Sequence, residues 1–374
     1  MQSQVPATWR LVCSEGFSKR WGVILAGGDG KRLLPLTRKI SGDDRPKQFC
    51  ALTGGETLLD RTRRRVSRTI ADQQTLLVLT QSHQPYYAGL VADVSPERLL
   101  IQPWNHGTAP AIAYCLTHLD RIDSEAVVGF FPSDHHFADE EAFTAQIHLA
   151  FVQAERHPER VVLLGISPDS PEEAYGWIEP GASLASGPVF EVRRFWEKPS
   201  RRLAVRLMRR GCLWNSFVMV GRVSAFLAVI RRALPDLLTS FDSMWAGVRP
   251  RSMASDLRAL YTKIPASNFS DDVLSVCPSS LAVVPARGLG WSDLGEPQRV
   301  LSAFRIPSIE WNHHADSLRP GLEVPASPVA LKTGVGNNTR RQKDFTCAGW
   351  GREAMSDEAN CLQLSDALTH RSGN

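Results

Sequence analysis

The sequence predicts an α/β protein with a mainly parallel sheet and helices on both of its faces. Short apolar runs recur as far as about residue 306, and segments with helical spacing of apolar residues separate most of them. Continuous apolar runs are typical of strands buried on both faces, and strands that alternate with helices form parallel sheets. With 374 residues, 43% of them hydrophobic, the chain can form one large α/β domain with an appendage, or two domains.

The N-terminal half of this pattern begins with an apolar strand at residues 23–26 that opens into a glycine-rich loop. Residues 35–49 are rich in Arg, Lys, Asp, Gly and Pro and are predicted to form an extended surface loop. A helix over 56–70 follows, with its arginines expected on a solvated face. Next come strands at 76–80 and 99–102 and a short helix over 84–92, in a βαβ arrangement.

The pattern continues to residue 166 and then changes. Thr108 is the expected N-cap of the next helix, with Pro110 in its first turn. Short β-like runs at 175–178 and 189–192 predict a smaller accessory β sheet beside the main one. The remaining predicted elements are strands at 126–131, 161–166, 213–220 and 281–284, and helices over 142–155, 201–210, 223–233 and 235–246.

Three parts are expected along the chain: an N-terminal extension at residues 1–20, a folded domain at 21–306, and a partly irregular or disordered tail at 307–374. The tail has too few apolar residues to offset the entropy lost on ordering. No apolar stretch approaches the length of a membrane span, and the first 20 residues lack the hydrophobic region of a signal peptide. No membrane association is therefore expected.

Charge and cysteine content narrow the class of protein. The net charge of +4, from 43 basic and 39 acidic residues, is too balanced to favour a nucleic-acid partner. The seven cysteines are odd in number and scattered, with no Cys-x-x-Cys pair. This distribution argues against a disulfide framework or a zinc site and favours reduced thiols in a cytoplasmic protein.

The glycine-rich loop after the first strand predicts phosphate binding. Gly27, Gly28 and Gly30 have no Cβ atom, so the backbone can turn sharply and direct its N–H groups at an anion. Lys31 and Arg32 add positive charge. The loop therefore indicates a nucleotide or another phosphate as ligand, although a glycine turn without a ligand is an alternative that the motif alone leaves open.

Two familiar phosphate-binding motifs do not fit this loop. Leu33 stands where the dinucleotide-binding fingerprint needs its third glycine. The ATPase P-loop needs a glycine five residues before its Gly-Lys pair, where this chain has Leu25, and a Ser or Thr where it has Arg32.

A metal ligand is expected at the end of the strand at 126–131. Asp134 lies at the carboxyl end of this strand, which is where a parallel sheet presents ligands. The neighbouring His135 and His136 point in opposite directions on an extended chain, and no Glu or Cys at zinc spacing joins them. Magnesium held by carboxylate oxygens is therefore favoured over zinc.

Three other polar residues have open interpretations. Lys47 follows Pro46, which stiffens the backbone and can hold the lysine beside a phosphate, but a solvated loop lysine is the simpler interpretation. Asn215 and Ser216 interrupt a buried strand, so they either satisfy backbone groups or face a ligand.

The order of these motifs resembles that of a known family. It runs Leu-Ala-Gly-Gly-x-Gly-x-Arg-Leu, Pro-Lys-Gln, Gly-Thr-Ala-Pro-Ala, Ser-Asp-His, Tyr-Gly-Trp-Ile-Glu, Glu-Lys-Pro, Trp-Asn-Ser and Trp-Ser-Asp-Leu-Gly. Between residues 21 and 303 the sequence resembles the sugar-1-phosphate nucleotidyltransferases, and within them the mannose-1-phosphate guanylyltransferases. The resemblance implies a Rossmann-like, GT-A-like nucleotidyltransferase fold with a mixed, mainly parallel sheet.

The resemblance also implies a reaction: transfer of GMP from GTP to mannose 1-phosphate, giving GDP-mannose and pyrophosphate, with Mg²⁺ as cofactor. Because the sugar phosphate is itself the nucleophile, the reaction needs positioning and charge neutralisation rather than a Ser, Cys or His nucleophile. Another nucleotide or another sugar, such as glucose 1-phosphate, and a non-catalytic sugar-nucleotide-binding regulatory protein are the alternatives. Members of the family often dimerise, so a homodimer is expected, although no residue demands it.

By position, the resemblance assigns roles to individual residues. The expected catalytic residues are Arg32, Lys47, Asp134, Lys198 and Asp293, of which Asp134 and Asp293 would hold magnesium. The expected nucleotide-binding residues are Leu25, Ala26, Gly27, Gly28, Gly30, Gln102, Gly107 and Thr108. The expected sugar-binding residues are Gly176, Glu197, Lys198 and Asn215.

Several positions depart from the family pattern. Phe217 stands where glycine is usual after Trp-Asn-Ser, Ala174 replaces a glycine before Tyr-Gly, and Gln102 stands where glutamate is common. Residues 269–272 correspond only loosely to the family's Ser-Ile-Asp, so the reaction type is predicted more firmly than the sugar. The chain has no room for the isomerase domain of bifunctional relatives, so a single activity is expected.

Overall fold

The computed structural model describes residues 19–52, 55–184, 188–247 and 253–304. The predicted tail at 307–374 lies outside these residues, as does the N-terminal extension apart from its last two residues. No helix among the described residues is long and apolar enough to cross a membrane.

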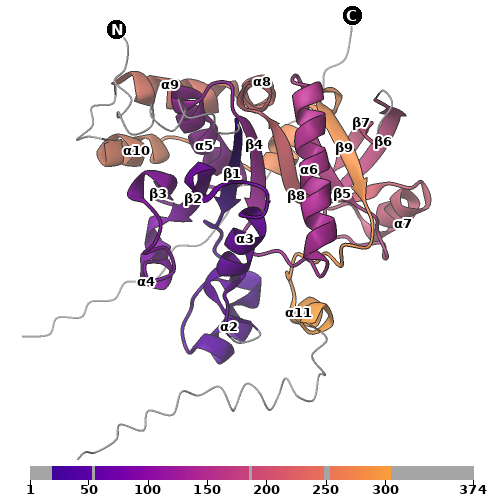
Figure 1. Cartoon of the computed structure of the whole chain (residues 1–374), viewed down its shortest axis with the longest axis horizontal. Coiled ribbons are helices and arrows are strands. Elements are labelled where there is room, and N and C mark those ends of the chain that lie inside the picture. Colours follow the sequence, from indigo (N-terminus) through magenta and orange to yellow (C-terminus); the bar gives the residue numbers. More distant parts are fainter. Residues whose placement is uncertain (1–18, 53–54, 185–187, 248–252, 305–374) are drawn as a thin grey trace, which may run out of the picture. The chain divides into compact units, whose positions relative to one another are not determined.

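One mixed sheet forms the centre of the described structure, with the strand order β3-β2-β1-β4-β8-β5-β9-β7-β6 (Figure 1). The strands are β1 (Arg20–Leu25), β2 (Thr75–Thr80), β3 (Leu99–Gln102), β4 (Val127–Pro132), β5 (Val161–Ile166), β6 (Trp177–Ser183), β7 (Phe190–Trp196), β8 (Leu213–Arg222) and β9 (Leu281–Ala286). β1 pairs in parallel with β2 and β4, and β5 pairs in parallel with β9. In this part of the chain only β7 and β8 run against the common direction. The mixed sheet is therefore confirmed, and most of its strands run in one direction, although the pairings of β7 and β8 make more of its strand pairs antiparallel than parallel.

Helices cover both faces of this sheet, as predicted. The α-helices are α2 (Leu34–Ser41), α3 (Leu58–Val66), α4 (Gln84–Tyr87), α5 (Thr108–Ile122), α6 (Glu140–Arg156), α7 (Arg201–Arg209), α8 (Val223–Ala233), α9 (Pro235–Gly247), α10 (Met253–Tyr261) and α11 (Pro297–Phe304). Apolar residues of α3, α6 and α7 form the core on one face, and those of α5, α8, α9 and α10 form the core on the other. A π-helix (Phe269–Leu274) packs against α5 and α8.

The prediction of an extended loop at residues 35–49 is wrong. α2 occupies residues 34–41, with Pro35 in its first turn and Gly42 in the left-handed conformation at its end. Proline near the start and glycine just past the end are the usual signals of a short helix, so the sequence did contain the information. Leu33 and Leu36 are buried against Leu58 and Leu294, and this packing stabilises the helix.

Three other expectations need correction. The runs after residue 168 do not form a separate sheet, because β6 pairs with β8 and β7 pairs with β9. The helix expected over 84–92 is reduced to the single turn of α4. The backbone of Gly107 occupies the N-cap position of α5, and the Thr108 hydroxyl instead accepts a hydrogen bond from the Phe269 N–H at 2.8 Å.

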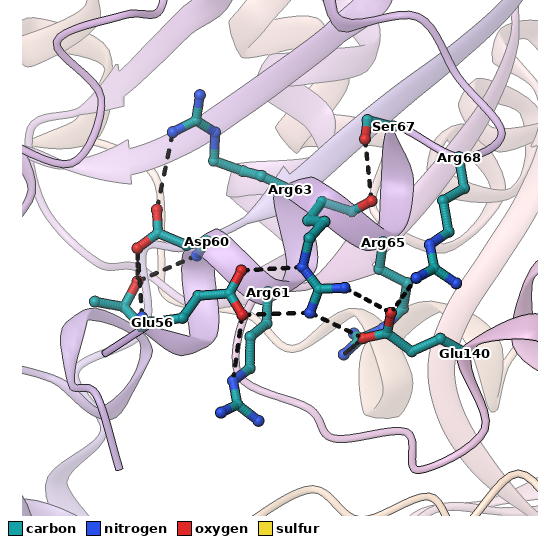
Figure 2. A network of polar contacts seen from close by, with 10 residues as sticks. Glu56, Asp60, Arg61, Arg63, Arg65, Ser67, Arg68 and Glu140 are labelled. Atoms are coloured by element: carbon teal, nitrogen blue, oxygen red, sulfur yellow. Dashed lines mark hydrogen bonds and ion pairs between the residues drawn. The ribbon is translucent and has the colours of Figure 1, made fainter. Parts of the chain in front are cut away.

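The arginines of α3 do not lie on a simple solvated face; they form a network of ion pairs with Glu56, Asp60 and Glu140 (Figure 2). Glu140, at the start of α6, lies 2.9 Å from both Arg64 and Arg68 and 3.8 Å from Arg65. The Arg65 side chain is only 3% exposed, and burial lowers its pKa to about 10. Glu140 thus compensates a buried guanidinium group and joins α3 to α6.

We expect Glu140→Gln to lower the free energy of unfolding by about 2 kcal/mol, because Arg65 would lose its nearest carboxylate. The exposed neighbour Glu141 provides the matched control, and Glu141→Gln should cost less than about 0.5 kcal/mol. Urea unfolding followed by circular dichroism measures both values. Equal values for the two variants would contradict this role for Glu140.

Candidate active site

The predicted site residues surround one cavity of about 440 Å³ at the edge of the sheet where β1 and β4 end. This is the edge at which open α/β sheets bind ligands. All of the predicted residues line the cavity except Ala26, Gly30 and Lys47. The structure thus brings together segments that are up to 268 residues apart, from Leu25 to Asp293.

The glycine loop has its acceptors satisfied and its donors free. Gln48 Nε2 donates to the carbonyl oxygens of Ala26, at 3.1 Å, and Gly28, at 2.6 Å, and the Thr80 hydroxyl donates to that of Gly27 at 3.0 Å. Among the described residues, none accepts a hydrogen bond from the backbone N–H groups of 27–30. Such a loop can bind an anion. The exposed Arg32 adds a cation at the cavity wall.

Gln48 is therefore a site residue that sequence reasoning missed, although it lies in the Pro-Lys-Gln motif. Its side chain is 1% exposed, and a buried polar side chain beside a glycine loop needs hydrogen-bond partners. A glutamine directly after the motif's lysine was the available signal.

Lys47 is not a solvated loop lysine. The residue is 8% exposed, and its Nζ donates to the carbonyl oxygens of Asp293, at 2.5 Å, and Leu294, at 3.3 Å. The same ammonium group lies 3.3 Å from Asp134 Oδ2. Lys47 therefore joins the segment after β9 to the end of β4, and the lysine lies behind the cavity wall that Asp134 and Asp293 form.

Asp134 and Asp293 lie on the wall of the same cavity because their segments pair with each other. His136 and Ser292 exchange two backbone hydrogen bonds, of 2.9 and 3.0 Å. This short antiparallel bridge holds Asp134, two residues before His136, close to Asp293, the residue after Ser292.

The Asp293 carboxylate has three hydrogen-bond donors on one oxygen. Oδ1 accepts from the Tyr175 hydroxyl at 3.1 Å, the Gly295 N–H at 2.9 Å and the Arg299 guanidinium at 2.8 Å. Burial raises the pKa of Asp293, but the electrostatic effect of His135, the hydrogen bond and charge of Arg299, and the charge of Lys47 together lower it by more than burial raises it. The pKa of Asp293 therefore lies below its usual range. The carboxylate is therefore ionised at neutral pH. Among the described residues, nothing donates a hydrogen bond to its other oxygen, Oδ2.

Tyr175 and Arg299 were not predicted as site residues. Arg299 lies on α11, ion-pairs with Glu172 at 3.0 Å and has its guanidinium 4.6 Å from the Tyr175 ring centroid. Arg299 belongs to no motif, so only the fold could place it beside Asp293. Tyr175 lies within the motif Tyr-Gly-Trp-Ile-Glu, of which only Gly176 was predicted to be a site residue.

On the far side of the cavity lie Gly176, Glu197, Lys198 and Asn215. The Asn215 N–H donates to the Gly176 carbonyl at 2.8 Å, and Lys198 Nζ lies 3.1 Å from Glu197 Oε1. A Cβ atom on Gly176 would lie 2.8 Å from Phe195 Cζ and 2.9 Å from Glu197 Oε2, so a larger residue here would have to displace one of these side chains. Lys198 adopts a positive φ of 43° and is half exposed, so its ammonium group is available to a ligand.

Gln102, Gly107 and Thr108 line the cavity near the glycine loop. The Gln102 amide is 2% exposed, and its Oε1 accepts from the Tyr261 hydroxyl at 2.9 Å. Gly107 has a φ of 91°, and a Cβ atom there would lie 2.3 Å from the Ser267 carbonyl oxygen. Gly107 is therefore required by the close packing of its loop against residues 267–269, whatever binds beside it.

Comparisons with known proteins find curated relatives that match most of this chain. Xanthan biosynthesis protein XanB of Xanthomonas campestris pv. campestris (strain B100) is 31% identical over 79% of this chain and 62% of its own length. Mannose-1-phosphate guanylyltransferase of Escherichia coli (strain K12) is 30% identical over 74% of this chain and 58% of its own length. The chain thus spans about three fifths of the length of these curated relatives.

The solved structures include a similar protein. The crystal structure of a mannose-1-phosphate geranyltransferase from Thermus thermophilus covers 77% of this chain and 79% of its own, with 28% sequence identity and a TM-score of 0.67. Residues 21–306 match the Nucleotidyl transferase family. The chain belongs to the Nucleotidyl transferase family.

Proposed function

We propose that the protein transfers GMP from GTP to mannose 1-phosphate, forming GDP-mannose and releasing pyrophosphate. The observation that carries the proposal is the cavity itself. A loop with free N–H donors lies on one wall, a group of polar side chains suited to a sugar phosphate lies on another, and the carboxylates of Asp134 and Asp293 line the same space. The relatives named as mannose-1-phosphate guanylyltransferases support the choice of nucleotide and sugar.

In the proposed reaction, an oxygen of the sugar phosphate attacks the α-phosphorus of GTP. The new bond joins that oxygen to the α-phosphorus, and the bond from the α-phosphorus to the oxygen that bridges it to the β-phosphorus breaks. The electron pair leaves with pyrophosphate. No side chain is needed as a nucleophile, so the protein acts by aligning the two phosphates and neutralising their charge.

The glycine loop and Arg32 would hold the triphosphate, and Lys198 would bind the phosphate of the sugar. The ammonium group of Lys198 is half exposed at the cavity, so it can reach an anion there. Glu197 and Asn215 would hydrogen-bond hydroxyl groups of the sugar. Gln102, Gly107 and Thr108 line the part of the cavity proposed for the base, and Lys47 would fix the wall beside the attacked phosphate.

The residues present also fit a magnesium ion. Mg²⁺ prefers oxygen ligands and is usually held by one or two carboxylates together with substrate phosphates and water. Asp134 and Asp293 line the same cavity, and Asp293 Oδ2 accepts no hydrogen bond from the described residues. The described residues contain no group of three or more His, Cys, Asp or Glu side chains suited to a metal, so phosphate and water oxygens would complete the set. When bound, the ion would offset negative charge on the phosphates.

The family generally uses a divalent metal ion; the choice of Mg²⁺ is part of the proposal. A homodimer and a location in the cytoplasm remain predictions from the family resemblance.

The proposal is tested by measuring pyrophosphate release from a panel of nucleoside triphosphates and sugar 1-phosphates with Mg²⁺. We expect GTP with mannose 1-phosphate to give the highest kcat/KM, and EDTA to abolish turnover. A strong preference for glucose 1-phosphate would overturn the sugar assignment. Binding of GDP-mannose without turnover of any pair would instead favour a regulatory, non-catalytic protein.

We expect Asp134→Asn and Asp293→Asn each to lower kcat by at least about 100-fold, because each removes a charge placed to hold the metal ion. The exposed Asp169 lies outside the cavity lining, so Asp169→Asn is the matched control and should leave kcat unchanged. Near-UV circular dichroism checks that all three variants are folded. Normal turnover in a folded Asp134→Asn or Asp293→Asn variant would remove that residue from the metal site.

A further inference from the structure

β8 contains a bulge beside the cavity, and polar residues of β8 itself stabilise this bulge. Leu163 of β5 pairs with Met219 and Gly165 pairs with Asn215, so residues 216–218 of β8 stand opposite Leu164 alone. The Ser216 hydroxyl donates to the Leu164 carbonyl at 2.6 Å and accepts from the Val218 N–H at 3.2 Å. The polar break seen in the sequence therefore satisfies the backbone of a bulge, and such bulges redirect side chains next to functional sites.

Phe217 is the central residue of this bulge and has a φ of 60°. The left-handed conformation is unfavourable for a bulky side chain, and it persists only where the surrounding structure enforces it. The Phe217 N–H donates to Asn215 Oδ1 at 3.1 Å, which holds the strained residue in place. Among the described residues, the other non-glycine positions with positive φ are Lys198 and Leu294, at the cavity wall and next to Asp293.

The position of Phe217 in this bulge places the residue at the cavity. Phe217 lines the cavity together with Asn215, two residues earlier on the same strand, and it is only partly buried against the core formed by α5 and α8. If Phe217 only packed in the core, a fully buried ring on an unstrained backbone would be more stable.

The groups around the ring suit one part of the ligand. Asn215 Oδ1 accepts from the Phe217 N–H, and the Asn215 amide still has N–H groups to offer to the cavity. Glu197, on the same wall as Gly176, offers carboxylate oxygens. A pyranose ring has an apolar C–H face and a rim of hydroxyl groups, so it matches an aromatic wall beside hydrogen-bonding side chains.

We propose that Phe217 is a specificity-determining residue that packs against the C–H face of the hexose while Glu197 and Asn215 bind its hydroxyl groups. The inference rests on the proposed function, because it assumes a sugar nucleotide in this cavity. It assigns a role to a residue that stands where the resembling family has glycine.

The test compares binding of GDP-mannose and GDP by isothermal titration calorimetry, in the wild type and in Phe217→Gly, Phe217→Ala, Phe217→Leu and Phe217→Tyr. The difference between the two ligands isolates the sugar. We expect Gly, Ala and Leu at this position to weaken GDP-mannose binding about tenfold and to leave GDP binding within about twofold. Tyr keeps the ring and should bind GDP-mannose within about threefold of the wild type. The Phe217→Leu variant keeps a large apolar side chain and the backbone strain, so a loss of affinity in this variant would be due to the missing ring.

Thermal unfolding tests the strain separately. Phe217→Gly should melt at a higher temperature than Phe217→Ala, because glycine adopts φ near 60° without strain. Arg194, exposed on β7, is the control: there the Ala variant should melt above the Gly variant, as is usual in strands. If Phe217→Ala instead melts at a higher temperature than Phe217→Gly, the backbone at residue 217 is not strained.

Three binding results would overturn the inference, and they are distinguishable. If the variants bind GDP and GDP-mannose more weakly by the same factor, the Phe217 ring contacts the nucleotide or only stabilises the fold. Unchanged GDP-mannose binding in a folded Leu variant would show that the ring does not contact the sugar, while the proposed function would stand. If the wild type binds GDP at least as tightly as it binds GDP-mannose and every other hexose nucleotide, the sugar adds nothing to binding. The sugar site and the proposed function then both fail.

Discussion

The rest of the site depends on the buried ammonium group of Lys47. A charged amine at 8% exposure is costly to desolvate unless acceptors surround it, and Lys47 Nζ has three oxygens within 3.3 Å. Two belong to the backbone after β9 and one to Asp134 after β4. The ammonium group therefore holds the Asp134 carboxylate and the backbone that carries Asp293 on one cavity wall before a ligand binds. Such preorganisation is the form of catalysis that phosphoryl transfer requires.

The two walls of the cavity are built in different ways. The glycine loop presents backbone donors, with Gln48 and Thr80 occupying its carbonyl groups, an arrangement suited to binding an anion. The opposite wall presents side chains on strained backbone, at Lys198 and Phe217, and these can distinguish one ligand from another. In the proposed reaction, the triphosphate would meet the first wall and the sugar the second.

Local patterns predicted most strands, the helices on both faces and the glycine loop, because buried strands and glycine turns leave signals within a few residues. The pairing of β6 and β7 with the main sheet depends on distant partners in β8 and β9, which no local pattern contains. Arg299 reaches Asp293 from a helix without a motif, so sequence reasoning had no basis for including it. The role of Phe217 needed its backbone angle, which comes from a bulge between two strands that are far apart in the sequence.

The most direct test of the central claim, that the protein aligns two phosphates and supplies no nucleophile, is the stereochemistry at the α-phosphorus. GTP carrying sulfur at the α-phosphorus in one configuration would be converted to the corresponding thio sugar nucleotide, and the product's configuration determined by ³¹P NMR. A single in-line attack by the sugar phosphate predicts inversion. Retention would require two displacements through a nucleotidyl-enzyme intermediate, and would contradict the account.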